Sequence, residues 1–216
     1  MSGASTFLPR GTVYGTLLNF RREVDAWQPR MDKTPYNAAP KAPVLYVKPA
    51  NTWTPSGGAI AVPARVPEVE IGATVAAVVG EDGEVAGYVL VNDLSIPHES
   101  FYRPPVKFKC LDGFFGLASG LRSAAEAGEP SQFRLTVKTN GAVVQTIDFA
   151  EMVRPAARLL ADIGEFMTLR DGDWLLLGLD ITADGRRPRA QVGDRIEISS
   201  PGFAILENSL VAETAA

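Results

Sequence analysis

Residues 85–113, VAGYVLVNDLSIPHESFYRPPVKFKCLDG, contain an apolar segment followed by a dense polar segment. The β-branched residues of VAGYVLV predict a strand that ends at Asn92 and Asp93. A break at Ile96-Pro97 follows, and then the only histidine of the chain, His98. Such a loop beyond an apolar strand is typical of a pocket lip, because the strand fixes the polar groups and the loop exposes them. The alternative from composition alone is a hydrated surface turn.

The segments around this stretch predict a mostly β protein. Val69–Gly80 alternates like one long strand, and the Gly80–Gly83 turn joins it to the Val85 strand as a hairpin. Asn140-Gly141, the strongest hairpin signal, separates two further strands, which we expect at residues 133–137 and 143–149. Many short strands with few helices favour a mixed β-sandwich or roll over a doubly wound sheet.

One convincing helix lies within residues 150–167. Its apolar side chains recur at helical spacing and are expected to pack in the core: Leu159, Leu160, Ile163, Phe166 and Met167. A short helix is expected at residues 20–27, followed by an irregular, proline-rich surface segment at residues 28–42. Short strands are expected at residues 12–18, 44–47, 59–62, 174–177, 196–198 and 202–206, the last of which ends the ordered part.

The composition is typical of a globular cytoplasmic domain. The 216 residues are 46% hydrophobic, and a net charge of −4 without a basic block argues against nucleic acid as a partner. The single cysteine, Cys110, excludes an internal disulfide framework and fits a reducing cytosol. The first residues lack the apolar core of a signal peptide, and no apolar run approaches the roughly 20 residues of a membrane span. We expect one domain over residues 1–216, with no membrane partner and with flexible tails at residues 1–11 and 211–216.

The sequence excludes several classes of catalytic site. A hydrolase triad needs a histidine base, and the only candidate, His98, has no serine in a nucleophile-elbow setting. Zinc-ligand spacing and phosphate-binding glycine loops are absent from the sequence. Lysine could activate Cys110, although a buried, unreactive thiol is the favoured interpretation. What remains is Asp93 at a strand end, with Lys48 and Lys109 able to receive an anionic group.

Taken in order, six segments resemble the fumarylacetoacetate hydrolase family: LLNFRREVDAW (17–27), LYVKPANTW (45–53), IGATVAAVVG (71–80), AGYVLVNDLSIPHESFYRPPVKFKCLDGF (86–114), EFMTLRDGDWLLLG (165–178) and VGDRIEI (192–198). Within the family, the chain resembles the N-terminal half, or N-terminal subunit, of the bifunctional isomerase/decarboxylases of bacterial homoprotocatechuate (4-hydroxyphenylacetate) breakdown. The resemblance covers residues 12 to 210 and implies a mixed β-sandwich roll, in agreement with the strand pattern.

The resemblance also implies a site for Mg²⁺ or Mn²⁺. Family enzymes hold the metal with a Glu-x-Glu pair on one strand and an aspartate on the next, and the metal stabilises the enolate of a 2-oxo acid. Asp93 matches the aspartate, but Gly72 and Thr74 stand at the glutamate positions. Glu68 and Glu70 lie four residues upstream, roughly 13 Å along a strand, and we interpret them as solvated edge charges. We therefore expect the metal to be weakly bound or absent.

Other family residues are altered or kept. The histidine and glutamate of the family's first helix fall on Glu23 and Ala26, and the late Thr-Gly-Thr-Pro segment falls on residues 177–180, Leu-Gly-Leu-Asp. Lys48 and Lys109 match family lysines. On this resemblance, the catalytic candidates are Glu23, Asp93, His98 and Lys109, and the substrate-binding candidates are Lys48, Tyr102 and Arg103. Their structural alternatives are a turn cap for Asp93, a surface pair with Glu99 for His98, and loop packing for Tyr102 and Arg103.

Three functional interpretations stay open. The first is an enzyme subunit acting on unsaturated oxo-acids, as isomerase of 2-hydroxyhepta-2,4-diene-1,7-dioate or decarboxylase of 5-oxopent-3-ene-1,2,5-tricarboxylate. Isomerisation only moves a proton along a conjugated dienol, so lysines and one acid/base group suffice without metal. The second is a non-catalytic partner of a metal-binding, C-terminal-type paralogous subunit, and the third is a generic small-molecule-binding domain. For the first two, the resemblance implies a homo-oligomer or a hetero-oligomer with that paralogue.

Overall fold

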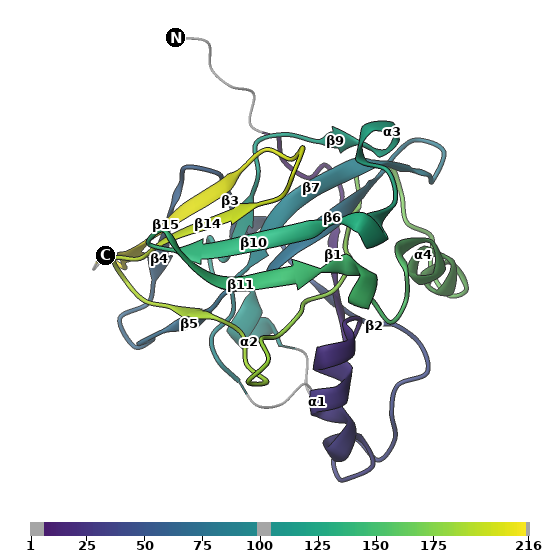
Figure 1. Cartoon of the computed structure of the whole chain (residues 1–216), viewed down its shortest axis with the longest axis horizontal. Helices are drawn as coiled ribbons and strands as arrows, with labels where there is room; N and C mark the ends of the chain where they lie inside the picture. Colours follow the sequence, from purple (N-terminus) through teal and green to yellow (C-terminus); the bar gives the residue numbers. More distant parts are fainter. Residues whose placement is uncertain (1–6, 99–104, 215–216) are drawn as a thin grey trace.

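The computed structural model describes residues 7–98 and 105–214, and two curled β-sheets form its frame (Figure 1). The larger sheet has the strand order β2-β1-β12-β6-β7-β8-β3, and β9 pairs with β7 beside this path. Its strands are β1 (Val13–Leu17), β2 (Val44–Val47), β3 (Trp53–Pro55), β6 (Ala73–Val79), β7 (Val85–Asp93), β8 (Phe115–Leu117), β9 (Arg122–Ser123) and β12 (Trp174–Leu176). The pairs β1–β12 and β3–β8 are parallel and the others are antiparallel, so the sheet is mixed.

The second sheet packs across the first and has the order β11-β10-β14-β15-β4 (Figure 1). Its strands are β4 (Ala59–Val62), β10 (Arg134–Thr139), β11 (Ala142–Asp148), β14 (Arg195–Ser199) and β15 (Leu206–Ala212). A short ladder of β5 (Val69–Glu70) and β13 (Arg189–Ala190) lies apart from both sheets. These mixed, curled sheets confirm the predicted mostly β fold of the sandwich-roll type.

Both predicted hairpins are confirmed. β6 and β7 pair antiparallel across the Gly80–Gly83 turn, and their strands are almost completely buried. β10 and β11 pair across Asn140 and Gly141, whose φ angles of 51° and 81° suit a residue pair that tolerates the left-handed region. The long β6–β7 hairpin therefore forms the centre of the core, and β7 carries Asp93 to its far end.

The helices are short, and most of the fold is strand and loop. In the described part of the chain they are α1 (Arg21–Met31), α2 (Val106–Lys109), α3 (Ala124–Ala127) and α4 (Ala156–Gly164), with 3-10 turns η1 (Ala50–Thr52), η2 (Pro130–Gln132) and η3 (Phe149–Glu151). None of them is long and apolar enough to cross a membrane. α4 lies in the predicted window with Leu159 and Ile163 buried, but Phe166 follows the helix and is 56% exposed, so it is not part of the core stripe.

Three predicted boundaries were wrong. α1 continues to Met31 with Pro29 in its last turn, so the irregular segment begins later than residue 28. Val69–Gly80 is not one strand, because the chain leaves β5 at Ile71 and Gly72 before entering β6 in another sheet. The last strand lies at Leu206–Ala212, later than predicted, because parallel pairing with β4 holds its outer residues.

Candidate active site

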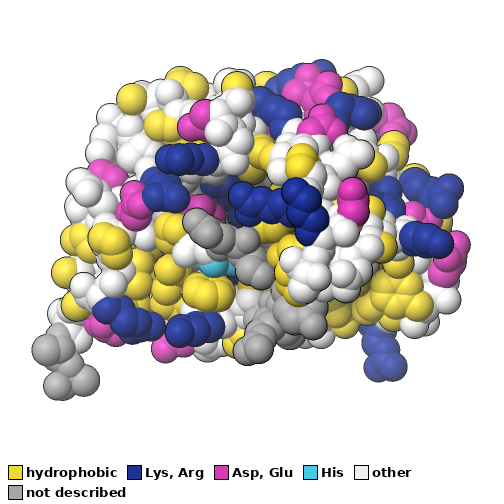
Figure 2. All heavy atoms as spheres, turned by 90° about the horizontal axis from the view of Figure 1, so that it is seen from below, with side chains coloured by type: hydrophobic (Ala, Val, Ile, Leu, Met, Phe, Trp, Pro, Cys, Tyr) yellow, Lys and Arg dark blue, Asp and Glu magenta, His cyan; other side chains and the backbone are white. Residues whose placement is uncertain are grey.

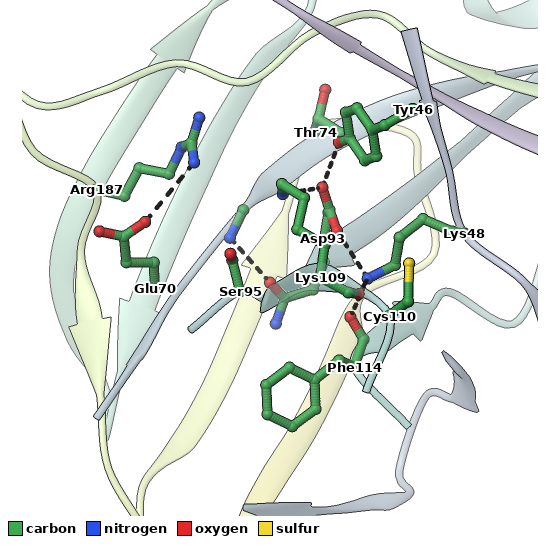
Figure 3. Close-up of polar contacts among 12 residues, drawn as sticks. Tyr46, Lys48, Glu70, Thr74, Asp93, Ser95, Lys109, Cys110, Phe114 and Arg187 are labelled. Atoms are coloured by element: carbon green, nitrogen blue, oxygen red, sulfur yellow. Dashed lines mark hydrogen bonds and ion pairs between the residues drawn. The ribbon is translucent and has the colours of Figure 1, made fainter. Parts of the chain in front are cut away.

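Asp93 lies in a buried cluster of charges at the end of β7 (Figure 3). Its Oδ2 accepts hydrogen bonds from Lys109 Nζ, at 2.6 Å, and from the hydroxyl of Tyr46, while its Oδ1 is 2.9 Å from Lys48 Nζ. Lys48 also donates to the carbonyl oxygens of Lys109 and Phe114. The structure thus brings together three residues that the sequence singled out and adds Tyr46, which it did not.

Local geometry explains how Tyr46 enters the cluster. Tyr46 on β2 and Lys48 just beyond it are two positions apart, so both side chains point to the same side of the strand. The Tyr46 ring lies on Gly15 of β1, where an added Cβ would be 2.0 Å from the ring. The sequence signal for Tyr46 was its two-residue spacing from Lys48. The apolar strand around it gave no further reason to select this tyrosine as a site residue.

The cluster fixes the charge states of its members. Burial tends to raise the pKa of Asp93, but the charges of Lys109 and Lys48 outweigh it, so this pKa lies well below the ordinary value of 3.8. Burial lowers the pKa of Lys109 to about 8, against the attraction of Asp93. Burial and the Asp93 charge raise the pKa of Tyr46 well above 10.0. Asp93 is therefore a carboxylate at neutral pH, neutralised by lysines.

The residues at this place do not fit a divalent cation. Mg²⁺ and Mn²⁺ need several oxygen ligands, but Gly72 offers no side chain and an added Cβ there would lie 2.2 Å from the backbone oxygen of Asp93. The Thr74 hydroxyl donates to the carbonyl oxygen of Gly178, and the Asp93 carboxylate is engaged by two ammonium groups. Among the residues that the structure describes, no group of three His, Cys, Asp or Glu side chains is arranged to hold a metal. Weak or absent metal binding stays a prediction.

A second buried cluster connects α1 to the loop before β13. Glu23 Oε1 accepts a hydrogen bond from Arg187 Nη2 at 2.7 Å, and its Oε2 accepts one from the backbone N–H of Leu18 at 2.7 Å. On the other side of the same guanidinium, Arg187 Nη1 is 3.7 Å from Glu70 Oε2 (Figure 3). Arg187 was not predicted, since the only signal was its place in an Arg-Arg-Pro-Arg run.

The interpretation of Glu70 as a solvated edge charge is wrong. Its side chain is 13% exposed and lies between Arg187 and Arg189, because the β5–β13 ladder brings these two segments together. Glu68 differs, since its side chain is 39% exposed and forms an ion pair with Arg189. Glu70 therefore belongs to the inner cluster and Glu68 to its rim.

Among the acid/base candidates, Glu23 has the change in pKa that best suits proton transfer. Burial raises its pKa above the ordinary 4.5, while Arg187, the Leu18 N–H and Lys109 oppose that shift. The influence of Lys109 on Glu23 means that the two clusters share one electrostatic environment. A carboxyl group with a raised pKa is better matched to proton transfer near neutral pH than an ordinary one.

A cavity of about 410 Å³ opens beside the second cluster. Its described lining includes two glutamates, Glu23 and Glu70, and four arginines, Arg30, Arg186, Arg187 and Arg189. The charged lining therefore carries an excess of two positive charges, although the whole chain is negative. Figure 2 shows Lys and Arg side chains gathered across this face of the molecule.

His98 also lines this cavity. Its ring stacks on Phe108 with centroids 4.7 Å apart, and its Nδ1 is 2.9 Å from the carbonyl oxygen of Ile96. Because that oxygen can only accept, Nδ1 carries the hydrogen. Burial lowers the pKa of His98 below 6.5, so the imidazole is neutral at neutral pH.

Several candidates do not reach the cavity. Lys48 and Lys109 are absent from its described lining, because their ammonium groups are bound to Asp93 and to backbone carbonyls. The expectation that these lysines hold substrate carboxylates is therefore not supported by their geometry. Burial raises the pKa of Cys110, which argues against a reactive thiolate. Tyr102 and Arg103, together with the Glu99 partner considered for His98, lie outside the described residues.

The sequence and the fold both have relatives among known proteins. The family model described as "Fumarylacetoacetate (FAA) hydrolase C-terminal" matches residues 12–211. Over 214 residues the chain is 39% identical to the 4-hydroxyphenylacetate degradation bifunctional isomerase/decarboxylase of Salmonella dublin and 38% identical to its namesake in Escherichia coli. Each match covers 94% of this chain and 48% of the relative, so the chain spans about half the length of these curated relatives.

A solved structure shares the fold at lower identity. It is fumarylpyruvate hydrolase from Pseudomonas aeruginosa in complex with Mn²⁺ and pyruvate, with a TM-score of 0.75 and 18% identity. The superposition covers 99% of this chain and 94% of the hydrolase.

Proposed function

This chain belongs to the fumarylacetoacetate hydrolase family, and from that premise we propose that it isomerises an unsaturated 2-hydroxy dioate, with 2-hydroxyhepta-2,4-diene-1,7-dioate as substrate. The family resemblance seen in the sequence is confirmed, and its curated relatives are isomerase/decarboxylases of 4-hydroxyphenylacetate breakdown. In the proposed reaction the dienol loses its hydroxyl proton, a proton adds to the far carbon of the diene, and a 2-oxo-3-ene dioate results.

The observation that carries the proposal is a buried carboxyl group at the wall of an arginine-rich cavity. Glu23 is fully buried, lines the cavity and has a raised pKa. The excess of two positive lining charges suits a substrate with two carboxylates. A pocket that is polar and cationic therefore fits this dianion better than a neutral ligand.

We assign the proton transfer to Glu23. Glu23 accepts the hydroxyl proton of the dienol and, as the carboxylic acid so formed, returns a proton to the far carbon; among the described lining residues the other carboxyl is Glu70, and Glu23 is the more deeply buried. Neutral His98 has its Nδ1 hydrogen bound to the Ile96 carbonyl and its ring stacked on Phe108, so it contributes a neutral, polar wall to the cavity and does not donate the proton. Asp93 acts at a distance, because it holds Lys109, whose positive charge lowers the pKa of Glu23.

A second candidate function is a non-catalytic partner subunit. The observation that favours it is the packing of Gly72 against Asp93, which leaves the family's carboxylate positions without metal ligands. In that case decarboxylation belongs to a metal-binding, C-terminal-type paralogue, and the chain completes a hetero-oligomer with it. The twofold length of the curated relatives supports such a pairing.

One assay distinguishes the two candidate functions. The purified chain is mixed with the C7 dienol in deuterated buffer, and the loss of dienol absorbance is followed together with deuterium incorporation by NMR. We expect turnover with deuterium at the far carbon, and a large loss of rate in Glu23→Gln. A rate equal to buffer, restored only by adding the metal-binding paralogue, would instead support the partner function.

A further inference from the structure

Arg187 is a buried cation that uses little of its hydrogen-bonding capacity. Its side chain is 6% exposed and lines the 410 Å³ cavity. A guanidinium has five N–H donors in a planar fork, yet the described contacts comprise one close hydrogen bond, from Nη2 to Glu23, and a looser approach of Nη1 to Glu70. Nε is buried and has no hydrogen-bond partner among the described residues.

Another arginine of the same chain shows the usual arrangement. Arg22 uses both Nε and Nη2 to bind the two oxygens of Asp180. That pairing satisfies one complete edge of the fork with one carboxylate, which is the geometry that arginine and carboxylate share. The corresponding edge of Arg187 has no such carboxylate within the described chain.

The backbone that follows Arg187 is fixed by hydrogen bonds. The carbonyl of the next residue, Pro188, accepts a hydrogen bond from the N–H of Ile71 at 2.8 Å, and Arg189 then pairs with Glu70 in the β5–β13 ladder. A buried donor without a partner costs free energy, and the hydrogen bond from Nη2 to Glu23 keeps the side chain from turning into solvent to recover it. A ligand oxygen can remove that cost.

We infer that Arg187 is the receptor for one carboxylate of the ligand and so determines specificity for dicarboxylates, an inference that rests on the proposed function for the identity of the ligand. The bound carboxylate takes donors that Glu23 and Glu70 leave unused, and the ligand's second carboxylate is attracted by the remaining arginines at the cavity rim. Glu23 and Glu70 disfavour a more highly charged group such as phosphate at the same place.

Direct binding of pimelate, the saturated C7 dicarboxylate, tests the inference by calorimetry. Glu23→Gln removes a carboxylate that competes for Arg187, so we expect it to bind pimelate more tightly than the wild-type chain. Adding Arg187→Met to this variant is expected to weaken binding roughly 10- to 100-fold, as the loss of a charge-assisted hydrogen-bonding group does. Both variants avoid leaving Glu23 as a buried, unpaired charge.

The control is Arg195→Met, which removes an exposed arginine paired with Glu207 on the other sheet and should leave pimelate binding unchanged. Equal pimelate affinity in Glu23→Gln with and without Arg187 would overturn the inference, as would weaker binding in Glu23→Gln than in wild type. If circular dichroism shows that the double variant is unfolded, the comparison of Glu23→Gln with wild type still tests whether removing this carboxylate tightens pimelate binding.

The outcomes also separate this inference from the proposed function. Pimelate binding that depends on Arg187, in a chain that never turns over the dienol, supports the carboxylate receptor and refutes the isomerase. The single variant Arg187→Met keeps Glu23. If it turns over the dienol with the same KM as wild type, that result supports the isomerase and refutes the carboxylate receptor.

Discussion

Two opposing influences set the pKa of the buried Glu23 carboxyl group. Burial favours its neutral form and raises its pKa, while the guanidinium of Arg187 and the N–H of Leu18 favour the charged form. A group balanced in this way changes charge at a higher pH than an exposed glutamate. The environment therefore suits a residue that must both accept and return a proton.

This balance predicts the acidic limb of the pH–rate profile. Glu23 must be deprotonated to accept the dienol proton, so kcat/KM should fall as pH decreases through its pKa, which lies above 4.5. Glu23→Gln should lose about 10²- to 10⁴-fold in kcat/KM, the usual contribution of one acid/base group, and its residual rate should lack that limb. The profile of kcat/KM against pH is the measurement. An unchanged acidic limb in the variant would assign it to another group.

At the residue scale, the sequence predicted some of the site and missed the rest. Asp93, Lys48 and Lys109 were each selected as site candidates, with the lysines expected to bind an anionic group of the substrate. The structure places the three together, but they bind one another and do not line the cavity. The partnership of Glu23 with Arg187 joins residues 164 positions apart through a loop whose course depends on β5 and β13. No local pattern encodes such a contact, so Arg187 could not be selected from a run of arginines.

At the scale of elements, the break between β5 and β6 has the largest effect on the site. Gly72 lies at this break, where its carbonyl accepts the N–H of Asp93 at 2.8 Å and its N–H donates to the Asn92 side chain. The close approach leaves no room for a side chain at position 72. The same break turns β5 away, which brings Glu70 to Arg187.

A substitution at the break should be costly. In Gly72→Ala the new Cβ would meet the backbone oxygen of Asp93 at 2.2 Å, so we expect the free energy of unfolding to fall by about 1–3 kcal/mol, as for overpacked cores. Gly164→Ala is the matched control, because nothing lies within 4 Å of a Cβ there and alanine favours the helix by about 0.5–1 kcal/mol. Urea denaturation measures both. Equal stability of the two variants would show that the backbone at residue 72 adapts without strain.

Regular elements were more predictable than the places where they end. Asn140-Gly141 predicts its hairpin from local conformational preference alone, and the periodicity of α4 identifies the helix. The break at Gly72 was missed because the alternation of Val69, Ile71, Ala73 and Val75 runs across it, and only the opposing backbone of Asp93 shows why the strand divides. Long-range packing thus overrode a consistent local pattern.

At the scale of the whole molecule, the fold brings two charge clusters to one end of the core. The larger sheet supplies Asp93 from β7 and Tyr46 from β2, while Glu70 comes from β5 and Arg187 from the loop before β13 (Figure 3). Glu23 comes from α1. The ammonium groups of Lys48 and Lys109 neutralise Asp93, the residue that the sequence resemblance matches to a metal-binding aspartate. We propose that protein side chains alone carry out the proton transfer.

The direct test of that claim is the ketonisation rate of the C7 dienol by the chain after treatment with a chelator, measured before and after Mg²⁺ is restored. We expect the same kcat/KM under both conditions, because Gly72 and Thr74 supply no carboxylate and Asp93 is bound to two lysines. Activity that disappears with chelation and returns with Mg²⁺ would contradict it.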